Sequence, residues 1–242
     1  MTFLAIYEMS LPPALRWAEN LTLSLRKTFE TAEANTLGAV MTDPDRFSAY
    51  LQERDVDLLF IICENERRTL QDFLNACRSL RIPYLFITDT MRKMPVLAES
   101  NPPLREVLAP VSMLEEEVHK AEILSSLHRY TGCRITLLQA ADFGHKAQRN
   151  TDRILTFLAS RADDGGTDFV RRLMAQKGSA DLHRELADRQ RELVPDMLVC
   201  TASREYGLDD LIFGPAERQV LRKAQVPVLL LNPRDDLFSL CD

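Results

Sequence analysis

Short apolar runs alternate with longer amphipathic stretches along this chain. The run Leu58 to Cys63 is apolar throughout, which is typical of a strand buried on both faces of a parallel sheet. Between Glu66 and Leu80, apolar residues recur at the spacing of a helix that buries one side. A second apolar run, Tyr84 to Thr88, follows. The pattern predicts parallel sheets covered by helices on both faces.

The same alternation predicts the remaining elements. Helices are expected at 14–32, 115–130, 151–161, 180–193 and 216–224, and a short one after Asp43-Pro44. Strands are expected at 3–7, 36–41 (weaker), 106–111, 134–140, within 168–176, 197–200 and 228–231.

Residues 89–104 interrupt the pattern, because Met94-Pro95 and Asn101-Pro102-Pro103 cannot easily continue regular structure. We therefore predict two units, residues 1–98 and residues 105–234. The first is expected to be a shortened copy that lacks one strand–helix pair, since so few residues precede its closing strand.

Two segments resemble each other and suggest a fold built twice. Each has an Asp before an apolar run, then a helix, a proline and a closing strand. Pro83 and Pro227 hold the same place, 144 residues apart. Proline at the first residue of a strand is tolerated. The alternative is that any α/β protein offers such units. The closing strands, 84–88 and 228–231, are apolar, so we expect them to pair with each other or with a second chain.

Composition narrows the function classes. The chain has 242 residues, 45% of them hydrophobic, with a net charge of −6. It has no visible basic stripe, so nucleic-acid binding is not expected. Its five cysteines form no C-x-x-C pair, which disfavours structural zinc and a disulfide framework. No run approaches ~18 apolar residues and no signal peptide is visible. A cytoplasmic protein away from membranes is expected.

Catalytic patterns are missing. His119, His128, His145 and His183 form no H-x-x-x-H pair, so no metal site is expected. Glu115-Glu116-Glu117 is interpreted as a complement to a helix dipole. Neither a nucleophile elbow nor a Walker loop is present. We therefore do not expect an enzyme.

Residues 105–233 resemble a universal stress protein domain. The resemblance is carried by the strands Val107–Val111 and Ile135–Ala140, and by the stretches Tyr206–Glu217 and Val220–Leu230. It implies a flavodoxin-like variant of the doubly wound fold, related to the adenine nucleotide alpha hydrolases. The closing unit of the first half extends the resemblance. The whole chain then resembles a tandem stress protein whose halves pack like two subunits of a dimer.

The resemblance also implies where a nucleotide would bind. Members that bind ATP carry Gly-x-x-Gly-x9-Gly-Ser/Thr after the fourth strand, because phosphates must approach the backbone closely. In this chain the pattern falls on Thr201, Arg204, Gly214 and Pro215, so only the third glycine is present. The acidic residue expected after the first strand falls on Ser112. In the first half, the link from Cys63 to the following helix is too short for such a loop.

ATP or AMP binding in the family manner is therefore not expected. The first hypothesis is a non-enzymatic stress-response or signalling module with an unidentified protein partner; a homodimer stays open. The second is a nucleotide-binding regulator with a diverged pocket near Ser112, Thr201, Arg204 and Gly214. Arg204 could attract another anion there. The third is an enzyme of unknown reaction, for which fold alone is no support.

Overall fold

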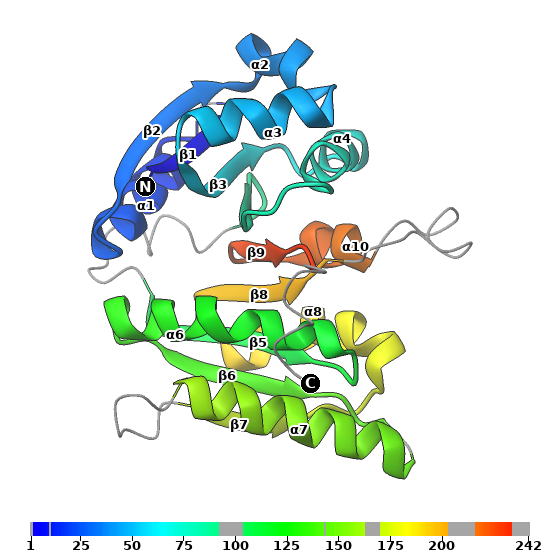
Figure 1. Cartoon of the computed structure of the whole chain (residues 1–242). Helices are drawn as coiled ribbons and strands as arrows, with labels where there is room; N and C mark the ends of the chain where they lie inside the picture. The colour runs from blue at the N-terminus through cyan, green and yellow to red at the C-terminus, as the bar shows by residue number, and fades with distance from the viewer. Residues whose placement is uncertain are drawn as a thin grey trace.

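One sheet of nine strands runs through the molecule, with helices on both faces (Figure 1). The computed structural model describes residues 2–9, 11–91, 104–142, 144–162, 170–202 and 216–233. The strands are β1 (Thr2–Tyr7), β2 (Thr28–Glu33), β3 (Val56–Cys63), β4 (Tyr84–Thr88), β5 (Glu106–Val111), β6 (Arg134–Gln139), β7 (Val170–Met174), β8 (Met197–Thr201) and β9 (Val228–Leu231).

Apart from α2 and α3, which follow each other, the helices alternate with these strands. They are α1 (Pro12–Ser24), α2 (Ala34–Met41), α3 (Pro44–Glu53), α4 (Arg67–Cys77), α6 (Lys120–Thr131), α7 (His145–Ala162), α8 (Leu182–Leu193) and α10 (Ala216–Lys223). Two short 3₁₀ helices, η1 (Glu115–His119) and η2 (Ser179–Asp181), precede α6 and α8.

The sheet joins two parallel blocks. Its order is β2-β1-β3-β4-β9-β8-β5-β6-β7, and among these described strands only the β4–β9 pair is antiparallel. The block β9-β8-β5-β6-β7 is a five-stranded doubly wound sheet, which confirms the predicted flavodoxin-like α/β class. The first block has four strands, and α2 and α3 follow each other between β2 and β3 with no strand between them. Its missing element is therefore an edge strand.

Two predicted elements near the amino terminus are wrong. The helix predicted at 14–32 ends at Ser24, and residues 28–33 form β2. Arg26, in the left-handed region at φ 58°, turns the chain between them. The strand predicted at 36–41 lies in α2. The cause is that β2 is an edge strand with little to bury: it packs chiefly through Phe29, whose ring lies 6.1 Å from that of Phe60.

The two blocks meet where β4 and β9 pair, a junction that we call the seam. Leu85 pairs with Leu229, flanked by Tyr84 with Leu230 and Phe86 with Val228. Leu85 and Leu229 are themselves 144 residues apart, the spacing of the predicted repeat. The seam therefore has a local two-fold axis at this pair, and the predicted pairing of the closing strands with each other is confirmed.

Side chains close one face of the seam. Asn232 donates to the carbonyls of Cys77 (2.7 Å) and Leu80 (2.9 Å) and accepts from the Tyr84 hydroxyl (2.9 Å). Helix α4 packs on α10, with a bond from Arg218 to Gln71 of 2.7 Å. On the opposite face α1 and α6 border a groove of about 490 Å³ over Leu85 and Leu229.

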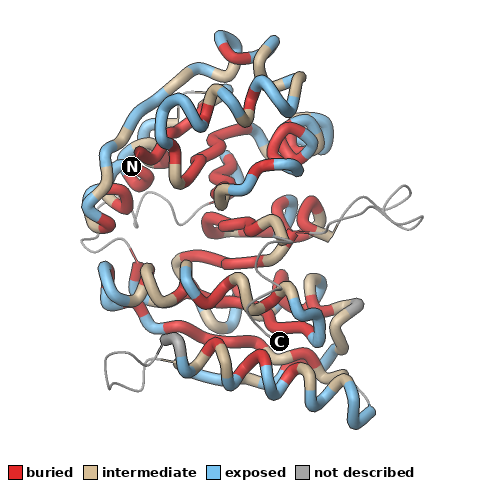
Figure 2. The backbone as a smooth tube through the Cα atoms, viewed as in Figure 1, coloured by how far each residue is buried: buried red, intermediate tan, exposed pale blue. Residues whose placement is uncertain are grey.

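Buried residues follow the sheet through both blocks (Figure 2), and they form one continuous hydrophobic cluster. Trp17, the single tryptophan, is fully buried in α1. Among the described residues, no helix combines the length and the hydropathy needed to span a membrane.

Candidate functional site

The carboxyl ends of β5 and β8 bring two sequence-predicted site residues together. Because these parallel strands are neighbours, Ser112 and Thr201, which stand at their ends, line one cavity of about 290 Å³. The crevice beyond the carboxyl ends of such strands is where open α/β sheets bind ligands. Arg204 and Gly214, as well as Pro215, lie outside the described residues. We call this space the polar cavity; its lining includes Pro110, Ser112, Glu117, Lys120, His183 and Thr201.

A buried ion pair occupies the wall of the polar cavity. The Ser112 hydroxyl donates to the Glu117 carboxylate at 2.9 Å, and the Lys120 ammonium donates to the same carboxylate and to the Pro110 carbonyl. Lys120 is 0% exposed and Glu117 is 6% exposed. Glu117 belongs to η1 and stands five residues after Ser112, the position where the resemblance to the family predicts an acidic residue.

Burying two charges is costly, and their attraction repays the cost only when hydrogen bonds complete their coordination. Here the short η1 turn makes this possible, because it directs Glu117 inward beneath the start of α6. The sequence interpretation of Glu115-Glu116-Glu117 as a complement to the helix dipole therefore holds poorly for Glu117, which is a wall residue of the polar cavity.

His183 enters the polar cavity from α8. Burial lowers its pKa from the ordinary value of 6.5, and the nearby Lys120 ammonium acts in the same direction. The carboxylates of Glu217 and Glu117 oppose this shift without cancelling it. The imidazole is therefore neutral at pH 7, able to donate from one ring nitrogen and accept at the other.

The hydroxyl of Thr201 completes the described wall. Its Oγ1 atom is buried and has no hydrogen-bond partner within the described part of the chain. An unsatisfied buried hydroxyl is uncommon in folded proteins, and each case calls for an explanation.

Comparison with known proteins identifies the fold's relatives. The model of the universal stress protein family matches residues 106–232, more than half of the 242-residue chain. The chain belongs to the universal stress protein family. No curated protein matches it in sequence.

Two solved structures share the whole architecture of this stress protein. The crystal structure of a universal stress protein from Archaeoglobus fulgidus DSM 4304 aligns over 97% of both chains, with a TM-score of 0.64 and 10% identity. A functionally unknown protein from Pseudomonas aeruginosa PAO1 aligns over 99% of this chain and 94% of its own, with a TM-score of 0.58 and 14% identity. At these identities the likeness establishes the fold, and it is consistent with a tandem arrangement.

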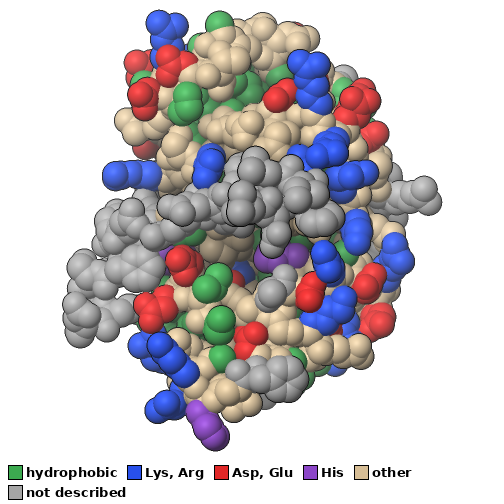
Figure 3. Space-filling model, turned by 90° about the vertical axis from the view of Figure 1, so that its right-hand side faces the viewer, with side chains coloured by type: hydrophobic (Ala, Val, Ile, Leu, Met, Phe, Trp, Pro, Cys, Tyr) green, Lys and Arg blue, Asp and Glu red, His purple; other side chains and the backbone are tan. Residues whose placement is uncertain are grey.

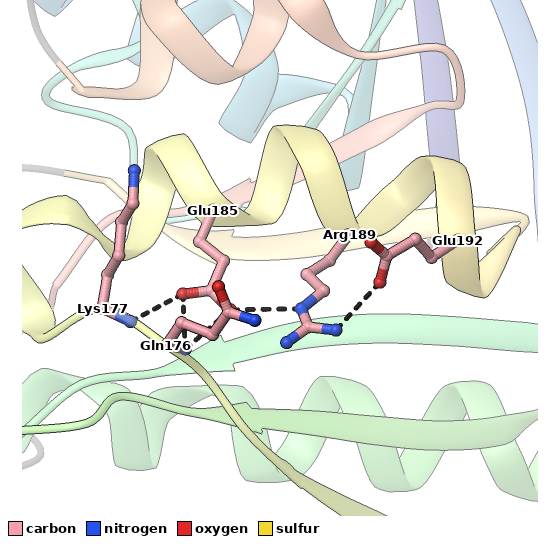
Figure 4. A network of polar contacts seen from close by, with 5 residues as sticks. All are labelled: Gln176, Lys177, Glu185, Arg189 and Glu192. Atoms are coloured by element: carbon pink, nitrogen blue, oxygen red, sulfur yellow. Dashed lines mark hydrogen bonds and ion pairs between the residues drawn. The ribbon is translucent and has the colours of Figure 1, made fainter.

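A second network fixes the helix that carries His183 (Figure 4). The Glu185 carboxylate accepts from the backbone N–H groups of Gln176 and Lys177 at 2.7–2.8 Å and from Arg189 at 3.1 Å. Burial acts to raise the pKa of Glu185, but these donors outweigh it and hold the pKa below its usual value. The start of α8 is thereby tied to the chain that leaves β7.

The first block has its own crevice at the carboxyl ends of its strands. An open cavity of about 600 Å³ is lined by Glu8, Gly38, Asp72 and neighbours. Burial, followed by the charge of Glu64, raises the pKa of Glu8. The link between β3 and α4 is only Glu64-Asn65-Glu66, and the backbone N–H of Asn65 donates to Asp89 at 2.8 Å. The link is as short as the sequence predicts, and it is too short to form a phosphate-binding loop.

Cysteines and metals add no further site among the described residues. Cys63, Cys77, Cys133 and Cys200 are free and buried. Burial raises the pKa of each thiol, to about 11 for Cys133 and about 12 for Cys200, so they are poor nucleophiles at neutral pH. Among these residues no group of three or more His, Cys, Asp or Glu could hold a metal ion.

Sequence reasoning placed Ser112 and Thr201 but missed Glu117, Lys120 and His183. Their signal was faint, since a charged residue on an amphipathic helix is ordinarily solvent-exposed. The one available cue is position: Glu117 and Lys120 follow the first strand of the block at i, i+3 spacing, which puts them on one helix face.

Proposed function

We propose that this universal stress protein is a non-enzymatic stress-response or signalling module that does not bind ATP in the family manner. The observation that carries the proposal is the polar cavity itself. A neutralised Glu117–Lys120 pair occupies its wall, and Ser112 is engaged by that pair. The sequence adds Arg204 and Pro215 where a phosphate loop needs glycine and a hydroxyl.

The non-enzymatic part of the proposal rests on how the described groups are bonded. The Ser112 hydroxyl donates to the Glu117 carboxylate, which also pairs with Lys120, so both groups are engaged in holding the wall of the polar cavity. The buried thiols are held protonated. A module that works by binding needs none of these groups to be activated.

A protein partner in the cytoplasm fits the surface charge. Figure 3 shows the side of the molecule toward which β8 points in Figure 1, and on its described residues acidic and basic side chains are intermingled. With a net charge of −6, this surface does not favour phosphate backbones or anionic lipids. Since β4 and β9 pair within the chain, a homodimer would have to use another surface.

A second candidate function is a regulator that binds a small molecule in the diverged pocket. The Thr201 hydroxyl, which has no partner among the described residues, and the cavity of about 290 Å³ favour it, because both can receive a ligand group.

Calorimetry with ATP, AMP and cyclic nucleotides tests the proposal. We expect no saturable ATP binding below about 1 mM, where the binding free energy is only about −4 kcal/mol. ATP binding in the low micromolar range, or adenine nucleotide retained through purification, would refute the proposal.

A gain-of-function variant sharpens this experiment. The triple variant T201G/R204G/P215S restores the small residues and the hydroxyl of the loop pattern. We expect it to bind ATP more tightly than the wild type does. The matched control T28G/R54G/P12S makes the same three changes at exposed positions of the first block and should behave like the wild type. If the triple variant binds ATP no more tightly than the wild type does, the loop residues are not what prevents ATP binding.

A further inference from the structure

The wall of the polar cavity is a built polar surface. Ser112, Glu117 and Lys120 line it, and each is at most 6% exposed. Charged groups so deeply buried are rare unless paired, and here the pair is also held by Ser112 and by the Pro110 carbonyl. A ligand would therefore meet groups whose positions are already fixed.

The wall has unused hydrogen-bonding capacity. An ammonium can donate three hydrogen bonds, and Lys120 donates two within the described part of the chain. Thr201 Oγ1 has no partner there. The Glu117 carboxylate accepts from Ser112 and Lys120, and its oxygens have further lone pairs. The cavity thus offers hydrogen-bond donors beside an acceptor.

The charge of the wall disfavours ionic ligands. Among the described lining residues, Glu116 and Glu117 stand against the ammonium of Lys120, and the buried Glu217 acts on His183 from α10. A phosphate group, with a charge of about −1.5 to −2, would lose water and face these carboxylates. A cation would meet Lys120. An uncharged polar ligand avoids both costs.

An uncharged ring with an acceptor next to a donor matches this surface, as in the lactam or amidine edge of a nucleobase. The volume of about 290 Å³ lies at the small end of ordinary ligand sites, which are roughly 300–1,000 Å³. We propose that the polar cavity binds an uncharged, nucleoside-sized heterocycle and excludes its phosphorylated form. This inference rests on the second candidate function and names its ligand class.

Titration of the full chain with adenosine, guanosine and uridine, and with their 5′-monophosphates, tests the inference by calorimetry and ligand-observed NMR at pH 7.5. For at least one nucleoside, the Kd should be at least ~10-fold lower than the Kd of its own monophosphate. The near-isosteric variant T201V should raise the Kd of that nucleoside about tenfold. T36V, which alters an exposed threonine on α2, should not.

A paired variant keeps the test independent of folding. E117Q/K120M removes both charges together, so that neither is left buried alone, and circular dichroism checks that it folds. It should lose nucleoside binding. A monophosphate that binds as tightly as its nucleoside overturns the inference, as does a T201V variant that binds like the wild type. If no nucleoside binds at millimolar concentration, this inference is wrong, but the proposed lack of ATP binding stands. If ATP binds at micromolar concentration, the proposed function is wrong.

Discussion

At the residue scale, the polar cavity depends on a few titratable side chains that come from different elements. Glu117 and Lys120 reach it from η1 and the start of α6, His183 from α8, and Glu217 acts on it from α10. Only in the folded chain are these groups neighbours. The protonation of His183, whose pKa is lowered in the folded chain, therefore links stability to pH.

His183 should make the protein less stable in mild acid. Its pKa in the folded protein is lowered from 6.5, first by burial and then by Lys120, while Glu217 and Glu117 partly oppose the shift. The unfolded chain therefore binds the proton more readily. The contribution of the neutral imidazole is fully present above pH 6.5 and is lost as pH falls below it. Urea denaturation at pH 5 to 8 should show this loss.

The H183N variant should flatten the dependence on pH in that window. His145 is exposed at the start of α7, so H145N should follow the wild-type curve. A wild-type stability that rises between pH 6.5 and 5 would contradict the direction of the shift.

Residue identity in the site was only partly predictable. Ser112 and Thr201 follow from the rule that ligand crevices lie at strand ends, once β5 and β8 are recognised. The burial of Lys120 could not be predicted, because it requires the inward turn of η1 and the Pro110 carbonyl as a partner. Pairing of buried charges is a tertiary property, and periodicity along the chain does not report it.

At the element scale, the predictions worked where a strand is buried on both sides and failed at the edge of the sheet. The central strands β3, β4, β5 and β8 match their apolar runs. Strand β2 does not, since it exposes most of its residues. The left-handed turn at Arg26 gives no glycine signal, so the helical pattern of α1 appears in the sequence to run on.

Asn232 should anchor α4 to β9. Its amide donates to the carbonyl of Cys77, the last residue of α4, and to that of Leu80 in the following turn, and its oxygen accepts from Tyr84. N232A would leave these groups without partners, so we expect a loss of about 2–4 kcal/mol in the free energy of unfolding. N75A, which removes an exposed side chain from α4, should change it by less than about 0.5 kcal/mol. Chemical denaturation measures both, and equal effects would contradict this role.

At the scale of the whole molecule, the seam makes one sheet and one hydrophobic core of two blocks. The predicted boundaries, 1–98 and 105–234, describe the sequence pattern and stay a prediction. A continuous core is expected to unfold cooperatively, because neither block can open without exposing the apolar strands of the seam.

Trp17 offers a direct measure of this coupling. It is the only tryptophan and reports on α1 in the first block, whereas far-UV circular dichroism reports on the whole chain. The two denaturation curves should coincide for the wild type. L229K, which places a charge in the seam, should separate them or lower both midpoints, whereas L23K on an exposed site should not. Separate curves in the wild type would contradict the coupling.

The seam between β4 and β9 has the two-fold symmetry of a homodimer interface, but both of its sides belong to one chain. Two identical subunits meeting this way would carry every change twice, once on each side. Leu85 and Leu229 stand on the axis and are identical, whereas Tyr84 differs from its counterpart Val228. Tyr84 could acquire its bond to Asn232 while the corresponding positions, Val228 and Thr88, became something else. Covalent linkage thus frees each side to specialise, so one block can shed an edge strand while the other remodels its ligand crevice.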